Sequence, residues 1–319
     1  MCRLERAIDQ GCGKDEGFTL VELLVSVVVL AILVVLMSQM LITTQNAWSL
    51  GEANKDRMQK ARAISDFIGN ELRAALLPIN RTNASNLQFV VNSTAITATT
   101  FNNHDSMFWQ APLATDQTLG DVAEVGYFVQ WDVTNAANPH SQLCRFFVNH
   151  GSGATPDPNF LIYSTPTAWL SNSVLLSVAP GNKANSYKGL FAENILGFWV
   201  QCLDPLGQQI VKDSSGAAFT NNSYDSRRGY TYTDTTQTPS TVVVAACALP
   251  PIIDLSVVTL DSGSAARITV AQRAVISPLV ASSANASAFV TSALASASFA
   301  PIRRGLRSYQ TRIYLPESK

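Results

Sequence analysis

The stretch Gly17-Phe18-Thr19-Leu20-Val21-Glu22 opens an apolar run that continues from Leu23 to Met37, and Glu22 is the only charged residue between Phe18 and Met37. About 20 predominantly apolar residues are enough for an α-helix to cross the hydrocarbon core of a bilayer. A carboxylate in such a helix is costly if it lies deep in lipid without a partner. The stretch therefore predicts a membrane-length helix whose single carboxylate needs a partner of opposite charge.

The helical pattern extends well beyond this run. No proline occurs between Phe18 and Leu77, and Pro78 then interrupts the pattern, because the residue before a proline disfavours helix. We expect one helix over 18–77, roughly 90 Å long, with its membrane-spanning part over about 18–38. In the second half, apolar side chains recur every three or four residues, which predicts one face packed on a globular domain. That face consists of Met58, Ala61, Ile64, Ile68, Leu72, Ala75 and Leu76.

Residues 78–319 have a different sequence pattern, with short runs of alternating apolar and polar residues between turn-forming residues. Six of these runs are expected to be strands: 87–91, 124–131, 143–148, 195–203, 252–260 and 309–315. They predict an antiparallel sheet with one face on a core and the other face wet. The fold class is thus α+β, with the apolar face of the helix packed on a β-rich head.

Two segments of the head are expected to lie outside the strands. Residues 204–241 are rich in Asp, Ser, Asn, Gly and Thr, which predicts an insertion or mobile loop. Residues 281–300 are biased to Ala and Ser, which predicts either a loose helix or a surface loop.

The composition limits the classes of function. The net charge is −1, and no basic tract is present, so nucleic acid is not an expected partner. The sequence lacks the Gly-x-Ser-x-Gly, His-Glu-x-x-His, Walker and dinucleotide-binding motifs. We therefore expect no enzyme, no catalytic residue and no cofactor.

The polar segment 204–241 holds side chains that suit two kinds of site. Asp213, Asp225 and Asp234 offer oxygen ligands for calcium, but no EF-hand loop is present, so solvated turn residues are expected and no metal. The same segment has aromatic and basic residues that either form a recognition loop or pack on the sheet. These are Tyr224, Tyr230, Tyr232, Arg227 and Arg228.

The chain has five cysteines. Cys2 and Cys12 precede Gly17, whereas Cys144, Cys202 and Cys247 lie in the head. An odd number cannot be fully paired within one chain. One disulfide with one buried thiol, and three buried thiols, are both compatible with the sequence, and the spacing matches no zinc pattern.

The residues around Gly17 resemble the prepilin cleavage signal of type IV pilins and type II secretion pseudopilins. The resemblance implies that residues 1–17 are a leader, which a prepilin peptidase removes after Gly17. It implies that Phe18 becomes an N-methylated amino terminus and that Glu22 pairs with the terminal amine of a neighbouring subunit. It also implies a single-pass protein of the bacterial inner membrane, with its head in the periplasm or, after assembly, at the cell surface. The implied partners are other pilin or pseudopilin subunits, the inner-membrane assembly platform and the lipid bilayer.

The order of the head strands is similar to that of the larger minor subunits. Minor pseudopilin J of type II secretion, minor pilin W of type IV pili and the Verru_Chthon cassette protein C family have this order. The resemblance implies a structural subunit of a pilus-like or pseudopilus filament, and the bulky head suggests a place at its tip. The alternative is a surface-displayed adhesin that uses the stem only for export and binds its ligand through 204–241. A plain signal anchor, and a membrane anchor joined to a coiled-coil linker, are further alternatives.

Overall fold

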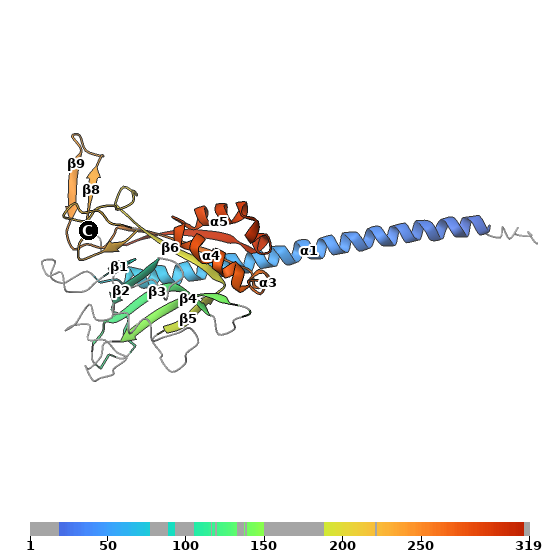
Figure 1. Cartoon of the computed structure of the whole chain (residues 1–319), viewed down its shortest axis with the longest axis horizontal. Coiled ribbons are helices and arrows are strands. Elements are labelled where there is room, and N and C mark those ends of the chain that lie inside the picture. The colour runs from blue at the N-terminus through green and yellow to red at the C-terminus, as the bar shows by residue number, and fades with distance from the viewer. Residues whose placement is uncertain are drawn as a thin grey trace, which may run out of the picture. The chain divides into compact units, whose positions relative to one another are not determined.

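The structure, a computed structural model, describes residues 19–76, 89–92, 105–132 except 116 and 119, 137, 139–149, 188–220 and 222–315. It divides into two compact units, Met1–Asn54 and Lys55–Lys319. A long helix precedes a head built from antiparallel sheets (Figure 1), so the predicted α+β class with a pilin-like architecture is confirmed.

Helix α1 spans Leu20–Arg73 and ends somewhat earlier than predicted. The Ala75 amide donates to the Leu72 carbonyl three residues before it (3.0 Å), which is the tightened geometry of a last helical turn. The next free amide, that of Leu76, donates to the Gln110 carbonyl of the head (2.9 Å). After this last turn, the chain is therefore bound to strand residues of the head through the Leu76 amide.

Within the first unit, α1 is exposed. The large apolar side chains of residues 20–37 have exposed fractions between 48% and 81%. An 18-residue window of the helix has a mean hydropathy of 3.1, so by length and composition α1 can cross a membrane. An apolar surface of this extent is covered by lipid or by other apolar helices in a working protein.

The described strands of the head form three sheets, and every strand pair is antiparallel. The strands are β1 Phe89–Val91, β2 Ser106–Ala111, β3 Ala123–Asp132, β4 His140–Asn149, β5 Lys188–Glu193, β6 Ile195–Leu203, β7 Tyr224–Asp225, β8 Tyr230–Asp234, β9 Thr241–Ala245, β10 Ile252–Thr259 and β11 Arg307–Tyr314. The order is β5-β4-β3-β2-β1-β7 in the largest sheet and β11-β10-β6 in the second. Strands β8 and β9 form a hairpin.

Short helices connect β10 to β11. They are α3 Ser262–Ala265, α4 Val270–Ser282, α5 Ala286–Ala295, η2 Ala297–Phe299 and η3 Arg303–Gly305. Thr269 and Gln272 form a capping box at the start of α4, and the Asn285 side chain caps α5. Of the two predictions for 281–300, the helical one is therefore confirmed over most of the segment.

The main core lies between the second half of α1 and two sheets. Ala61, Ile64, Ile68 and Leu72 join one buried cluster with residues of β1, β2, β3, β6, β10 and β11. The predicted apolar face is confirmed for Ala61, Ile64, Ile68 and Leu72, whereas Ala75 and Leu76 lie beyond the end of the helix and Leu76 is half-buried. Met58 is 63% exposed. The apolar spacing predicts which side of the helix is buried, but it does not predict where along the helix the contact with the head begins.

A second core covers the other face of the β11-β10-β6 sheet. Leu196, Trp199 and Val258 pack there against Ile276 and Phe289 of α4 and α5. The expectation of one wet sheet face is therefore wrong for this sheet, since every residue of β10 is buried. The helices between β10 and β11 provide the cover.

An ion pair fixes α1 to the largest sheet. Arg145 on β4 donates to both oxygens of the Glu71 carboxylate, from Nη2 to Oε1 (2.5 Å) and from Nε to Oε2 (3.2 Å). The Tyr127 hydroxyl on β3 also donates to Oε2 (2.5 Å). Burial raises the pKa of Tyr127, and the neighbouring Glu71 carboxylate raises it further. This hydroxyl therefore stays protonated and remains a donor. The Arg145 guanidinium also lies over the rings of Phe67 and Phe147.

Glu71→Gln should lower the free energy of unfolding of the head by roughly 3 kcal/mol, because removing one partner leaves the Arg145 charge partly buried and unpaired. Urea unfolding monitored by tryptophan fluorescence measures this change. Asp66→Asn, an exposed acidic position of the same helix, is the matched control and should be near neutral. An equal, small effect of both substitutions would contradict the anchoring role.

A second buried carboxylate links the two larger sheets. Asp105, directly before β2, accepts from the Val200 amide of β6 (2.9 Å) and from Asn92 Nδ2 (3.1 Å). Only 5% of Asp105 is exposed. Burial raises the pKa of Asp105 to about 7, although both hydrogen bonds oppose the shift. The carboxyl therefore binds a proton in the folded head at a pH where the unfolded chain has released it.

This difference predicts a stability that falls as the pH rises. Between about pH 4 and pH 7, Asp105 should reduce the free energy of unfolding by up to about 1.4 kcal/mol per pH unit. Asp105→Asn removes the titration, so unfolding measured across this window should show a flatter profile. Asp234→Asn, whose pKa is lowered by hydrogen bonds from Thr236, should leave the slope unchanged. Superimposable slopes for the wild type and Asp105→Asn would contradict the assignment.

Candidate functional site

The described chain begins with a capping box at the start of α1. The Thr19 carbonyl accepts the first helical hydrogen bond from the Leu23 amide (3.2 Å). The Glu22 amide donates to Thr19 Oγ1 (3.3 Å), and the Thr19 amide donates back to Glu22 Oε2 (3.0 Å). This reciprocal pattern satisfies two of the amides that a helix start leaves without partners. It also places the carboxylate near the positive end of the helix dipole.

The Glu22 carboxylate keeps one oxygen available. Within the described chain, its hydrogen bonds, including one from Thr19 Oγ1 (3.0 Å), end on Oε2. Oε1 therefore remains open to a donor from another molecule. Glu22 can thus cap its own helix and bind an external cation at the same time.

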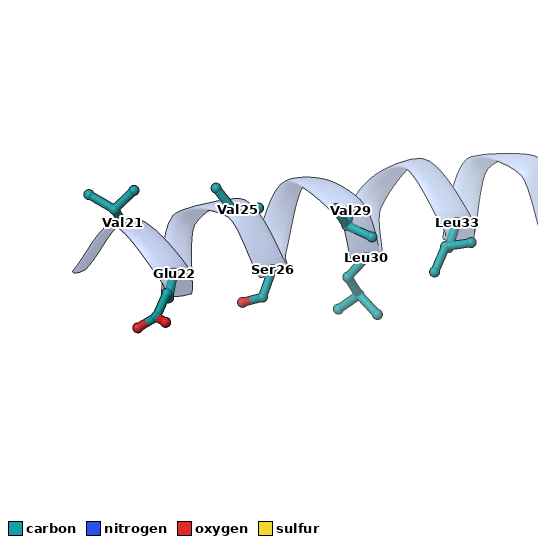
Figure 2. A pocket seen from close by; sticks show the side chains of 7 residues that line it. All are labelled: Val21, Glu22, Val25, Ser26, Val29, Leu30 and Leu33. Carbon is teal, nitrogen blue, oxygen red and sulfur yellow. The ribbon is translucent and has the colours of Figure 1, made fainter. Parts of the chain in front are cut away.

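The surroundings of Glu22 are apolar. A shallow hollow on the helix surface is lined by Val21, Glu22, Val25, Ser26, Val29, Leu30 and Leu33. Figure 2 shows Glu22, Ser26 and Leu30 pointing to the same side of α1, as expected for residues four apart. Residues 23–51 contain no charged side chain. Any helix or lipid that covers this side therefore surrounds one carboxylate with apolar groups.

The other predicted residues of this site are placed as follows. Gly17 and Phe18, the predicted cleavage and methylation positions, lie outside the described residues, as does the predicted leader 1–17. Thr19 was not predicted as a functional residue. The signal for it was in the sequence, because Thr followed three residues later by Glu is the pattern of a capping box.

The cysteines of the head form no disulfide in the structure. Cys144, Cys202 and Cys247 are all buried as thiols. Of the two alternatives that the sequence left open, the structure has three buried thiols. Burial raises the pKa of the Cys202 thiol, which keeps it protonated and unreactive.

The polar segment 204–241 belongs to the head and is not a loop of free side chains. It contains β7, β8 and two further β-bridges, so the prediction of a loop is wrong over these residues. Tyr224 and Tyr230 lie in the main core, and the Tyr224 hydroxyl donates to the Ala248 carbonyl (2.5 Å). Of the two predictions for these tyrosines, packing on the sheet is confirmed.

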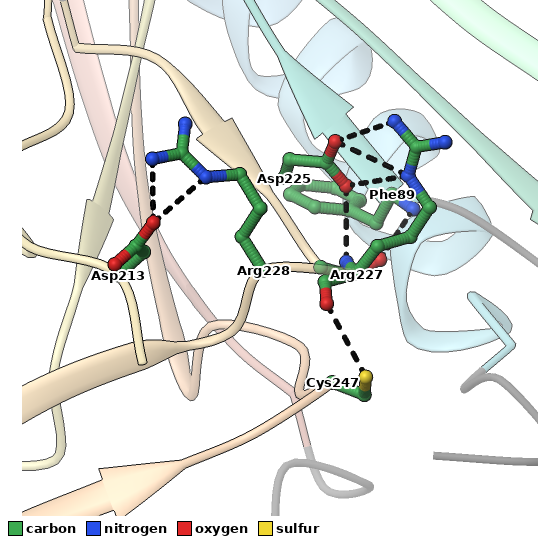
Figure 3. A network of polar contacts seen from close by, with 7 residues as sticks. Phe89, Asp213, Asp225, Arg227, Arg228 and Cys247 are labelled. Atoms are coloured by element: carbon green, nitrogen blue, oxygen red, sulfur yellow. Dashed lines mark hydrogen bonds and ion pairs between the residues drawn. The ribbon is translucent and has the colours of Figure 1, made fainter. Parts of the chain in front are cut away.

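Two arginines and two aspartates of this segment form ion pairs with one another (Figure 3). Arg228 donates to Asp213 through Nε (2.8 Å) and Nη2 (2.5 Å), and Arg227 Nη2 donates to Asp225 (2.7 Å). The Cys247 thiol donates to the Arg227 carbonyl (3.2 Å). Burial opposes ionisation of Asp213, but hydrogen bonds from Ser215 and Arg228 outweigh it and lower the pKa of this carboxyl to about 2.

The three aspartates therefore do not converge on one point. Asp213 and Asp225 each have their own arginine, and Asp234 accepts from Thr236 within its own turn (2.6 Å). Across the part of the chain that the structure describes, no group of three or more His, Cys, Asp or Glu side chains is placed to hold a metal ion. The ion pairs in Figure 3 thus join residues within the segment, and the Cys247 thiol links it to the part of the head that follows.

Comparison with known proteins gives one match. Residues 12–38 match the family model described as the prokaryotic N-terminal methylation motif. No curated protein and no solved structure matches the chain. The match covers Gly17, Phe18 and Glu22 as well as the whole apolar run to Met37. The amino-terminal part of this chain therefore carries a type IV prepilin-like methylation motif, followed by a helix that is long and apolar enough to anchor it in a membrane.

Proposed function

We propose that the chain is a structural subunit of a type IV pilus-like filament or a type II secretion pseudopilus. A prepilin peptidase cuts after Gly17, and Phe18 becomes the N-methylated amino terminus. The subunit waits in the bacterial inner membrane as a single-pass protein and is then packed through α1 into a filament with other pilin-like subunits. The observation that carries this proposal is the methylation motif over residues 12–38 on an apolar helix that leaves its side chains exposed.

Glu22 supplies the register of assembly. In a bundle of apolar helices an unpaired carboxylate is costly, so a helix that positions a cation beside it is strongly preferred. The terminal amine of a cleaved neighbour is such a cation, and Glu22 Oε1 is available to receive it while Oε2 caps the helix. Burial of the remaining apolar surface, at about 25 cal/mol per Å², drives the packing itself.

The size of the head supports a place at the filament tip. The second unit, Lys55–Lys319, contains two separate apolar cores and several sheets. A head of this bulk crowds its neighbours in a repeating filament, whereas a tip subunit has neighbours on one side only. Immunogold imaging should therefore label filament ends, and labelling along the whole length would contradict this part of the proposal.

The pairing of Glu22 is tested by substitutions that separate its charge from its capping role. Gln serves as well as Glu in a capping box, so Glu22→Gln keeps the helix start but removes the charge. We expect both Glu22→Ala and Glu22→Gln to be cut after Gly17 normally and to be lost from the sheared filament fraction. Immunoblots of whole cells and of sheared filaments measure cleavage and incorporation separately.

Thr19→Ala is the matched control. It removes the Thr19 side-chain cap, at about 1 kcal/mol of helix stability, and leaves the charge of Glu22 in place, so incorporation should persist. Normal incorporation of Glu22→Gln together with failure of Glu22→Ala would show that capping matters and that the charge pair does not.

A further inference from the structure

The hairpin of β8 and β9 has one open edge. Within the described chain, β9 pairs with β8 alone. On the other side of β8, the Thr231 amide donates to the Lys212 carbonyl (3.2 Å), so that side is partly paired. Figure 1 shows the hairpin extending from the head with β9 on its outer side. Alternate residues of an antiparallel strand direct their amide and carbonyl to the same side, so β9 presents backbone groups without partners along its outer edge.

The composition of β9 differs from that of the other edge strands. Natural edge strands are protected from further pairing by charged side chains, by short length or by cover. Strands β5 and β11 each carry two charged residues, and β7 has only two residues. Strand β6 is covered where its Val200 amide donates to Asp105 (2.9 Å). Strand β9 reads Thr-Val-Val-Val-Ala and contains no charge, no proline and no bulge, so none of these devices protects it.

One face of the hairpin exposes β-branched side chains. Val242 is 70% exposed and Val244 is 57% exposed, and their partners on β8 are Thr233 and Thr231. The opposite face is packed on the head, since Tyr230 lies in the main core. A hairpin of two strands is marginally stable by itself and gains stability from a third strand. The outer edge of β9 therefore suits an extended strand without charges.

A second copy of the chain offers such a strand in β9 itself. The charged side chains of β5 and β11 would lose water beside the exposed valines, whereas a second β9 brings none. If Val243 lies opposite the partner's Val243, all five residues of each strand overlap. Val242 then lies opposite the partner's Val244, which gives two β-branched cross-strand pairs on one face. A slip of one residue would turn the valines of the two copies to opposite faces.

We propose that β9 is an interaction surface through which two copies of the chain join their heads, by antiparallel pairing of β9 with β9 into one continuous sheet. The pairing is two-fold symmetric, as in the commonest class of homo-oligomer. Five residues on each copy are far fewer than the roughly 20–30 residues a side of a stable interface. The contact is therefore weak and forms where copies are concentrated. It depends neither on cleavage after Gly17 nor on the place of the subunit in a filament.

Disulfide trapping tests both the pairing and its register. The purified full chain in detergent micelles carries either Val242→Cys or Val244→Cys, both at exposed positions, and is oxidised at high protein concentration. Directly opposite residues have Cα atoms about 4.5–5.5 Å apart, within the range of a disulfide. Two copies of the same variant place their thiols two residues out of register, beyond that range. A mixture of the variants should therefore give about ten-fold more covalent dimer on non-reducing gels than either variant alone.

The matched control is Val270→Cys on α4, which is similarly exposed at 54%. Mixed with Val242→Cys, it should give only the yield of random collision. Thr241→Cys mixed with Ala245→Cys repeats the test at the next opposite pair, so a variant that fails to fold does not end it.

Equal yields from the mixture and from each variant alone would overturn the proposal, because association through α1 brings copies together without selecting a register in β9. Absence of covalent dimer from both mixtures would overturn it as well. The yields do not depend on whether Glu22 variants join a filament, so failure of the pairing and failure of the proposed function are distinguishable.

Discussion

The exposed apolar length of α1 is the constraint on which the account depends. From residue 23 to residue 51 the helix has no charge, and its first large apolar side chains are about half to four-fifths exposed. At about 25 cal/mol per Å², such a surface strongly favours lipid or other apolar helices over water. The same surface fits a bilayer before assembly and a helical bundle after it. Glu22 is the one charged group at the start of this apolar surface, so it can favour a neighbouring helix that brings a cation over one that does not.

The second half of α1, in contrast, has its apolar side chains covered, because it is fixed to the head. Its apolar face lies in the main core, and polar contacts secure both ends of the packed segment. Arg57 binds the corner formed by α3 and η3, and Glu71 binds β3 and β4. A shift of the helix along the head would break both contacts. From Lys55 onward, helix and head therefore form one compact unit.

The sequence predicted the features that depend on local patterns, and it failed where distant residues decide the outcome. The apolar run with Glu22, the amphipathic second half of α1 and the strands around Tyr127, Trp199 and Leu255 follow from periodicity. Strands β2 and β5 were missed because their partners in the sheet, and not their own pattern, make them strands. Residues 204–241 appeared loop-like because the pairing of Asp213 with Arg228 and the burial of Tyr224 and Tyr230 arise only after folding. Glu71 was not singled out in the sequence, since no pattern near it in the chain indicates its partner Arg145.

Mass spectrometry of the protein recovered from the cell envelope tests the central claim most directly. Cleavage and methylation predict an amino-terminal peptide that begins at Phe18 and carries one methyl group on its terminal amine. Recovery of a product with residues 1–17 still attached would contradict the account, because the terminal amine that Glu22 is proposed to bind would not exist.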